Sequence, residues 1–96
     1  MNYSFHPHAE KELEEVIDYY DSISESLGDE FCTDIEATIS RILKFPNAWQ
    51  PLSASTRRCR LNSFPYGVVY QIGAGEIRLI AVMHLHREPN YWGNRE

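Results

Sequence analysis

The sequence has little that would support a large, secreted or membrane-bound protein. With 96 residues, the chain is too short for two ordinary domains, and we expect one domain over residues 1–96. It contains no apolar run that approaches the ~20 residues of a membrane-spanning helix. The N-terminus shows neither the basic segment nor the apolar core of a secretion signal. We therefore expect a cytoplasmic protein that does not enter a membrane.

Cysteine is scarce, and the spacing of Cys32 and Cys59 fits no metal or redox motif. We expect both to be reduced thiols in the core. The histidines form two close pairs, at residues 6–8 and 84–86, but no cysteine or carboxylate completes either pair at ligand spacing. The sequence therefore predicts no metal site and no cofactor. Internal repeats, low-complexity stretches and linkers are also absent.

Lysine is missing from the second half of the chain, where every cation is an arginine. Residues 45–96 contain six arginines and three acids, whereas residues 1–44 contain eleven acids and three lysines or arginines. The net charge of −5 therefore conceals an acidic half and an arginine-bearing half. Because arginine binds phosphate and carboxylate groups bidentately, the second half predicts a surface that meets an anion.

The acidic half predicts a short strand and two helices. Residues 3–5 alternate as a strand does, and Pro7 suits the first position of a helix. Apolar residues then recur every three to four positions, which predicts a helix over roughly residues 8–24. A capping box at residues 26–29 predicts the start of a second helix that ends near Lys44. Because the connection is short, the two helices should be antiparallel neighbours.

The arginine-bearing half changes to a period of two. The stretch 57–61 alternates and places Arg58 and Arg60 on one face of a strand. Residues 66–72 are rich in β-branched and aromatic side chains, and the strand expected over residues 77–86 is apolar on both faces at its centre, as a central strand is. We therefore predict an α+β fold with a short N-terminal strand, an antiparallel helical hairpin and a three-stranded antiparallel meander. Both helices should pack on one sheet face and leave the other open.

Three segments of the chain resemble the RelE/ParE superfamily. They are Phe5-His6-Pro7-His8-Ala9, the strand Phe64-Pro65-Tyr66-Gly67-Val68-Val69-Tyr70, and the ending Ile80-Ala81-Val82-Met83-His84-Leu85-His86-Arg87-Glu88-Pro89-Asn90-Tyr91-Trp92. This superfamily consists of toxins of bacterial type II toxin–antitoxin systems, which are also known as plasmid stabilisation proteins. The resemblance covers nearly the whole chain. It implies a small twisted sheet with two helices on one face, and a separate antitoxin that wraps and neutralises the toxin.

The resemblance implies one of two targets. RelE-like members cut messenger RNA on the ribosome without a metal, whereas ParE-like members poison DNA gyrase. The ribonuclease branch carries an arginine after the tyrosine of the second meander strand, but here Gly67 follows Tyr66. The sheet lysines of many ribonuclease members are also missing. These departures favour a ParE-like toxin over an mRNA endoribonuclease, and a non-toxic interaction module with the same fold stays a third hypothesis.

Whether the chain is an enzyme stays open. RNA cleavage without a metal needs a base, an acid and cations around the phosphate. The residues that could supply proton transfer or charge lie at the end of the last strand and in the tail: His84, His86, Arg87 and Tyr91. Because Arg78, His84 and His86 share strand parity, we expect them on one sheet face. The alternative is that these polar residues are simply solvated.

A binding role is the other prediction for the arginines. The candidate contacts with a target or an antitoxin are Arg57, Arg58, Arg60, Arg78, Arg87, Tyr91 and Trp92. The anion could be a phosphate or a carboxylate of the antitoxin, and the Tyr91–Trp92 pair could instead fold back over the core. The expected partners are a cognate antitoxin and either DNA gyrase or ribosome-bound mRNA. Edge strands leave both a homodimer and a hetero-oligomer with the antitoxin open.

Overall fold

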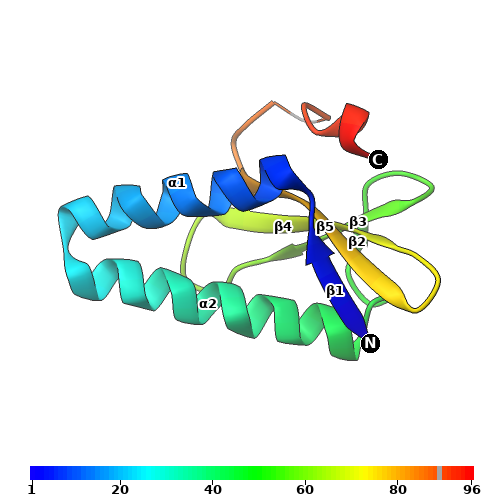
Figure 1. Cartoon of the computed structure of the whole chain (residues 1–96), viewed down its shortest axis with the longest axis horizontal. Helices are drawn as coiled ribbons and strands as arrows, with labels where there is room; N and C mark the ends of the chain where they lie inside the picture. The colour runs from blue at the N-terminus through cyan, green and yellow to red at the C-terminus, as the bar shows by residue number, and fades with distance from the viewer. Residues whose placement is uncertain (89) are drawn as a thin grey trace.

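The chain folds into one five-stranded sheet with a helical hairpin, as seen in a computed structural model that describes residues 1–88 and 90–96. The elements are β1 (Asn2–Phe5), α1 (Pro7–Ile23), α2 (Glu25–Lys44), β2 (Gln50–Pro51), β3 (Thr56–Arg60), β4 (Tyr66–Ile72), β5 (Glu76–His84) and a 3₁₀ turn (Gly93–Arg95). The strand order is β1-β5-β4-β3-β2 (Figure 1). β1 is parallel to β5, and the other pairs are antiparallel. The predicted α+β fold is confirmed, with a two-residue strand, β2, that the sequence did not indicate.

The two helices are separated by one residue, Ser24. Its backbone is extended, its N–H donates to Tyr20, and its hydroxyl accepts from the N–H of Leu27 at 3.1 Å. Ser24 therefore ends α1 and caps α2. The predicted start of this helix, at a capping box over residues 26–29, was wrong by two residues. Serines occupy every second position from 22 to 26, and each of them suits an N-cap. No helix among the described residues is long and apolar enough to cross a membrane.

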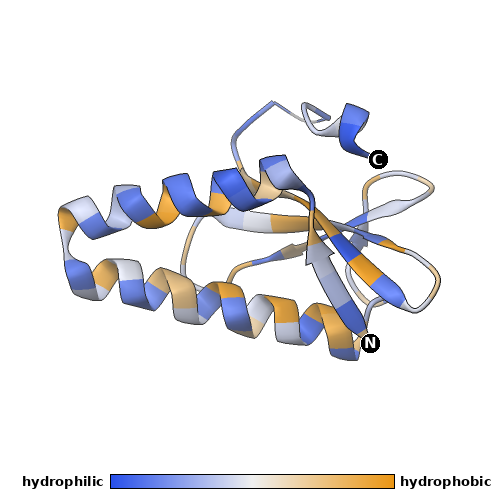
Figure 2. Cartoon of the chain, viewed as in Figure 1, coloured by the Kyte–Doolittle hydropathy of each residue, from blue (hydrophilic) through white to orange (hydrophobic). Residues whose placement is uncertain are grey.

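The main core lies between the helices and the inner sheet face. From α2, Phe31, Ile35 and Ile42 pack against strand residues that include Cys59 and Val68. Figure 2 shows the apolar stripes of the helices against their polar outer surfaces. Cys59 is buried as expected, while Cys32 is only half-buried on α2. Burial raises the pKa of both thiols, so they stay protonated and unreactive at neutral pH.

A β-bulge in β5 changes which side chains face the helices. Val69 pairs with Ala81, but the next residue of β4, Tyr70, pairs with Leu79. Ile80 is therefore an extra residue, and strand parity reverses across it. Arg78 lies on the face opposite the helices, whereas His84, opposite Tyr66, lies on the helix face. The prediction that Arg78 and His84 share a sheet face was wrong for this reason.

We call the sheet face opposite the helices the outer face. The prediction that this face is open was wrong. The C-terminal tail, which follows β5 (Figure 1), covers part of it through Trp92. A second cluster of buried residues forms there from Val69, Ile80, Ala81, Met83 and Trp92. The strand also ends at His84 rather than at residue 86. The chain turns there, and the N–H of Arg87 donates to the carbonyl of His84 at 3.0 Å.

Candidate functional site

Arg58 and Arg60 extend from β3 onto the outer face, because Cys59 between them belongs to the core. The stem of Arg58 lies over Gly67 of β4: a Cβ atom at Gly67 would be 3.0 Å from both Cγ and Cδ of Arg58. The guanidinium donates through Nη2 to Oε1 of Gln50 at 2.8 Å. The stem of Arg58 thus fills the space over Gly67, the position at which the ribonuclease pattern has an arginine.

The guanidinium of Arg58 has no counter-ion among the residues that the structure describes. Among the described residues, neither Arg58 nor Arg60 forms an ion pair. Burial, and next the charge of Arg60, lower the pKa of Arg58. An arginine nonetheless stays charged at neutral pH. This part of the outer face therefore carries two positive charges that an external anion could neutralise.

The other predicted arginine contacts lie elsewhere. Arg57 belongs to the helix side of β3, where its Nη1 donates to the carbonyls of Asn47 at 3.1 Å and Trp49 at 2.8 Å. Its guanidinium thus holds the loop that follows α2. Arg78 lies on the outer face, but near the β4–β5 turn and opposite Gln71. The seven predicted contact residues therefore do not form one continuous patch.

The tail is fixed by an ion pair between Glu12 of α1 and Arg95. The two side chains are joined by hydrogen bonds of 2.8 and 3.3 Å and are only 15% and 11% exposed. Oε1 of Glu12 also accepts from the N–H of Val82, and Arg95 donates to the carbonyl of Ile80. β1 ends beside Leu79, so no strand pairs with this edge of β5 after that residue. Glu12 and Arg95 supply the hydrogen bonds that the backbone groups of Val82 and Ile80 would otherwise lack there. Nothing in the local sequence distinguishes Glu12 from the exposed acids of α1, such as Glu14 and Glu15.

Arg87 and Tyr91 pack against the same ion pair. The guanidinium carbon of Arg87 lies 3.7 Å from the centre of the Tyr91 ring, a cation–π contact. The Tyr91 hydroxyl is buried and has no partner in hydrogen-bond geometry, although Glu12 is close enough to affect it. Burial first, and then Glu12, raise the pKa of Tyr91 against the opposing effect of Arg87 and Arg95. Tyr91 is therefore a neutral hydroxyl at physiological pH.

The histidine pair lies at the end of β5. The ring of His84 is 5.0 Å from that of Tyr66, and its Nδ1 accepts from the N–H of His86 at 3.1 Å. His86 is exposed in the turn, with its ring 5.4 Å from that of His84. His84 and Arg58 are thus on opposite faces of the sheet. The described part of the structure does not bring this proton-transfer candidate together with the outer-face arginines.

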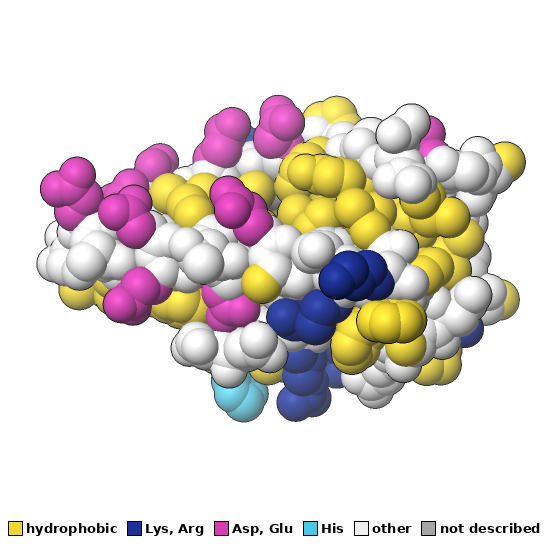
Figure 3. All heavy atoms as spheres, turned by 90° about the horizontal axis from the view of Figure 1, so that it is seen from below, with side chains coloured by type: hydrophobic (Ala, Val, Ile, Leu, Met, Phe, Trp, Pro, Cys, Tyr) yellow, Lys and Arg dark blue, Asp and Glu magenta, His cyan; other side chains and the backbone are white. Residues whose placement is uncertain are grey.

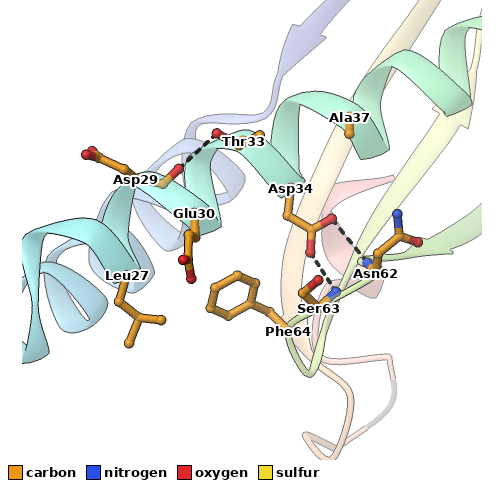
Figure 4. Close-up of a pocket in the computed structure, with 9 residues that line it drawn as sticks. All are labelled: Leu27, Asp29, Glu30, Thr33, Asp34, Ala37, Asn62, Ser63 and Phe64. Carbon is orange, nitrogen blue, oxygen red and sulfur yellow. Dashed lines mark hydrogen bonds between the residues drawn. The ribbon is translucent and has the colours of Figure 1, made fainter.

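The remaining surface divides by charge. In Figure 3 the acidic side chains gather toward one end of the molecule, and the basic side chains lie nearer its middle, beside a larger hydrophobic area. A hollow of about 560 Å³ lies between α2 and the β3–β4 loop, where Asp34 accepts from the N–H groups of Asn62 and Ser63 (Figure 4). It contains none of the predicted site residues. Within the described residues, no three His, Cys, Asp or Glu side chains are placed to hold a metal ion.

Comparison with known proteins gives one consistent family. Residues 3–89 match the family model "ParE toxin of type II toxin-antitoxin system, parDE". "Toxin ParE2" of Mycobacterium tuberculosis, in strains CDC 1551 / Oshkosh and H37Rv, is 31% identical over 86 residues, covering 88% of this chain and 82% of the relative. A solved chain described as "Chromosomal ParDE TA system from P. aeruginosa" aligns with a TM-score of 0.64 at 11% identity. That alignment covers 88% of this chain and 95% of the other, and it supports the fold.

Proposed function

The chain belongs to the ParE toxin family of type II toxin–antitoxin systems, and from this premise we propose that it inhibits bacterial growth by binding an essential target protein. DNA gyrase is the candidate target, and a cognate antitoxin neutralises the toxin by binding it. Residues 1–96 act in this proposal as a single toxin domain in the cytoplasm.

The opposite placement of Arg58 and His84 is the observation that carries a binding mechanism. Metal-independent RNA cleavage requires a base, an acid and a cation around one phosphate. On the outer face, Arg58 and Arg60 supply cations, but His84 lies on the opposite face of the sheet. Tyr91 packs against Arg87 and lies close to Glu12. This arrangement suits recognition of an anionic partner better than catalysis.

Two features favour an antitoxin as one partner. Arg58 and Arg60 form no ion pair with any described residue, and the short strands β1 and β2 are both edges of the sheet. A flexible antitoxin segment that folds on binding could pair with such an edge while its acidic side chains meet the arginines. The solved P. aeruginosa chain comes from a structure described as a ParDE toxin–antitoxin system.

Induced expression in a bacterial host, followed by assays with the purified chain, tests the proposal. We expect growth arrest, rescue by the product of the neighbouring open reading frame, and inhibition of gyrase supercoiling. Replacing Arg60 with Gln should weaken the arrest, while the matched change Lys44→Gln at the exposed end of α2 should not. Ribosome-dependent mRNA cleavage that His84→Ala abolishes would contradict the proposal. Growth without arrest would instead indicate a non-toxic binding module.

A further inference from the structure

A small hollow lies on the outer face between the sheet and the C-terminal tail. Its volume is about 140 Å³, and its walls are Leu52, Arg58, Met83, Asn90 and Trp92. The tail reaches over the sheet because Asn90 adopts a left-handed backbone with φ of 67°, a conformation that asparagine tolerates. Trp92, which follows this turn, is 2% exposed and completes the wall.

Two residues that line this hollow, Arg58 and Trp92, each carry an N–H group that has no partner among the described residues. Nε of Arg58 and Nε1 of Trp92 are both buried and make no hydrogen bond with the described residues. Each is an N–H that can only donate. A buried N–H without an acceptor is costly, and buried polar groups are nearly always paired. The protein shields both atoms, and the residues that carry them line one hollow whose occupant would lie beside the rest of the Arg58 guanidinium.

The occupant should be an anion, because Arg58 brings a charge that no carboxylate of the described residues neutralises. The hollow is larger than the ~30 Å³ share of one water, and three of its five walls, Leu52, Met83 and Trp92, are apolar. A carboxylate on an alkyl stem satisfies both the charge of Arg58 and the apolar walls. A nucleic-acid backbone fits less well, because it presents no apolar stem to these walls.

We infer that Arg58 and Trp92 form a carboxylate-binding subsite, occupied by an aspartate or glutamate side chain from an acidic segment of a partner protein. The carboxylate accepts from the guanidinium of Arg58, and its stem lies against Leu52, Met83 and the indole of Trp92. Gly67 contributes by leaving room for the stem of Arg58. The inference rests on the proposed function in one respect, since the partner expected to bring this side chain is the antitoxin.

Nuclear magnetic resonance on the purified full chain tests the subsite directly, because the N–H groups of Arg58 Nε and Trp92 Nε1 give resolvable signals. The probe is N-acetylglutamate α-amide, with N-acetylglutamine amide as its neutral match, at constant ionic strength. We expect saturable shifts of both signals with the charged probe, half-saturated at millimolar concentration, and none with the neutral one. The indole N–H of Trp49, which already donates to the Arg41 carbonyl, serves as the internal control and should not move.

Variants separate the subsite from general charge. Arg58→Lys keeps the charge but lacks the planar guanidinium, so we expect binding of the charged probe to weaken about tenfold. Lys44→Arg, a charge-conserving change at the exposed end of α2, should bind as the parent does. The dispersion of the spectrum shows whether each variant is folded, and the titration of the unaltered protein needs no variant at all.

Three outcomes would overturn the inference. In the first, neither signal shifts with the charged probe, or Trp49 shifts equally. In the second, Lys44→Arg weakens binding as much as Arg58→Lys does. In the third, inorganic phosphate binds at least as tightly as the carboxylate probe, which would indicate a nucleic-acid contact. A toxic chain with unmoved signals would refute the subsite alone, and a responsive chain that does not arrest growth would refute only the proposed function.

Discussion

Glu12 shows how different two carboxylates of one helix can be. The acids of α1 are mostly exposed, whereas Glu12 is bonded to Arg95 and to the backbone of Val82. Its charge holds the guanidinium of Arg95 against the carbonyl of Ile80. A mostly buried ion pair contributes little over a hydrophobic pair, but removing one member leaves an uncompensated charge. Glu12 therefore holds the tail against β5, and the exposed acids beside it make no such contact.

We expect Glu12→Gln to lower the free energy of unfolding by about 3 kcal/mol. Glutamine has nearly the same shape and can still accept from Val82, so the loss reflects the unpaired charge of Arg95. Urea denaturation measures it, with Glu15→Gln on the exposed surface of α1 as the control, which should change the value by less than about 0.5 kcal/mol. Equal effects of the two substitutions would show that Arg95 does not depend on Glu12.

Gly67 matters because it has no side chain, which leaves room for the stem of Arg58 over β4. We expect Gly67→Ala to push the stem of Arg58 away, because the new Cβ would be 3.0 Å from two of its carbons. Stability should change by less than about 1 kcal/mol, since alanine suits a strand better than glycine does. The affinity for the carboxylate probe should fall several-fold. Gly73→Ala, where the nearest atom would be 3.5 Å away, is the control, and an equal loss there would contradict this role.

Among the elements, the tail after β5 contacts both the outer face and one edge of the sheet. Trp92 covers the apolar outer face, and Arg95 closes the edge of β5. Both contacts are made by residues within a single turn. The tail therefore serves as a further layer of the fold, and it is also one wall of the proposed subsite.

We expect Trp92→Ala to destabilise the protein by about 3 to 5 kcal/mol, the range for removing a buried tryptophan. The substitution exposes Ile80 and Met83 and leaves a void under the tail. Thermal or urea denaturation measures the loss, and Tyr19→Ala, at an aromatic residue that is 58% exposed, should have little effect. A small loss for Trp92→Ala would mean that the tail can detach without affecting the sheet.

The elements also show what the sequence could and could not predict. Alternation placed Arg58 and Arg60 on the outer face correctly, because β3 is regular between residues 57 and 60. It failed for His84, because the bulge at Ile80 reverses parity and nothing in an all-apolar run marks a bulge. The bond between Glu12 and Arg95 spans 83 positions, and two charged residues so far apart carry no local signal of pairing.

At the scale of the whole molecule, the charge imbalance corresponds to the two layers of the fold. The acids lie mainly on the helical hairpin, and six of the seven arginines lie on the strands and in the tail. Two of the arginines, Arg57 and Arg95, are used inside the protein. The outer-face charge available to a partner is thus smaller than the sequence total suggests, and it is concentrated at Arg58 and Arg60.

The stability of the whole fold should depend on pH through Tyr70. This side chain is fully buried, and its hydroxyl donates to the carbonyl of Pro46. Burial raises the pKa of Tyr70 from 10.0 to about 12. Between these values the unfolded chain loses the tyrosine proton while the folded protein keeps it. Stability therefore falls as pH rises through this window, by up to about 1.4 kcal/mol per pH unit.

Tyr70→Phe removes this dependence. At pH 7 we expect the variant to be less stable by about 1 kcal/mol, because the Pro46 carbonyl loses its donor. Between pH 10 and 12 the variant should lose stability more slowly than the parent, so that the two unfolding curves approach and then cross. Urea denaturation at a series of pH values measures both slopes, with Tyr19→Phe at the exposed neighbour of α1 as the control. Parallel slopes for Tyr70→Phe and the parent would show that the buried hydroxyl does not control alkaline unfolding.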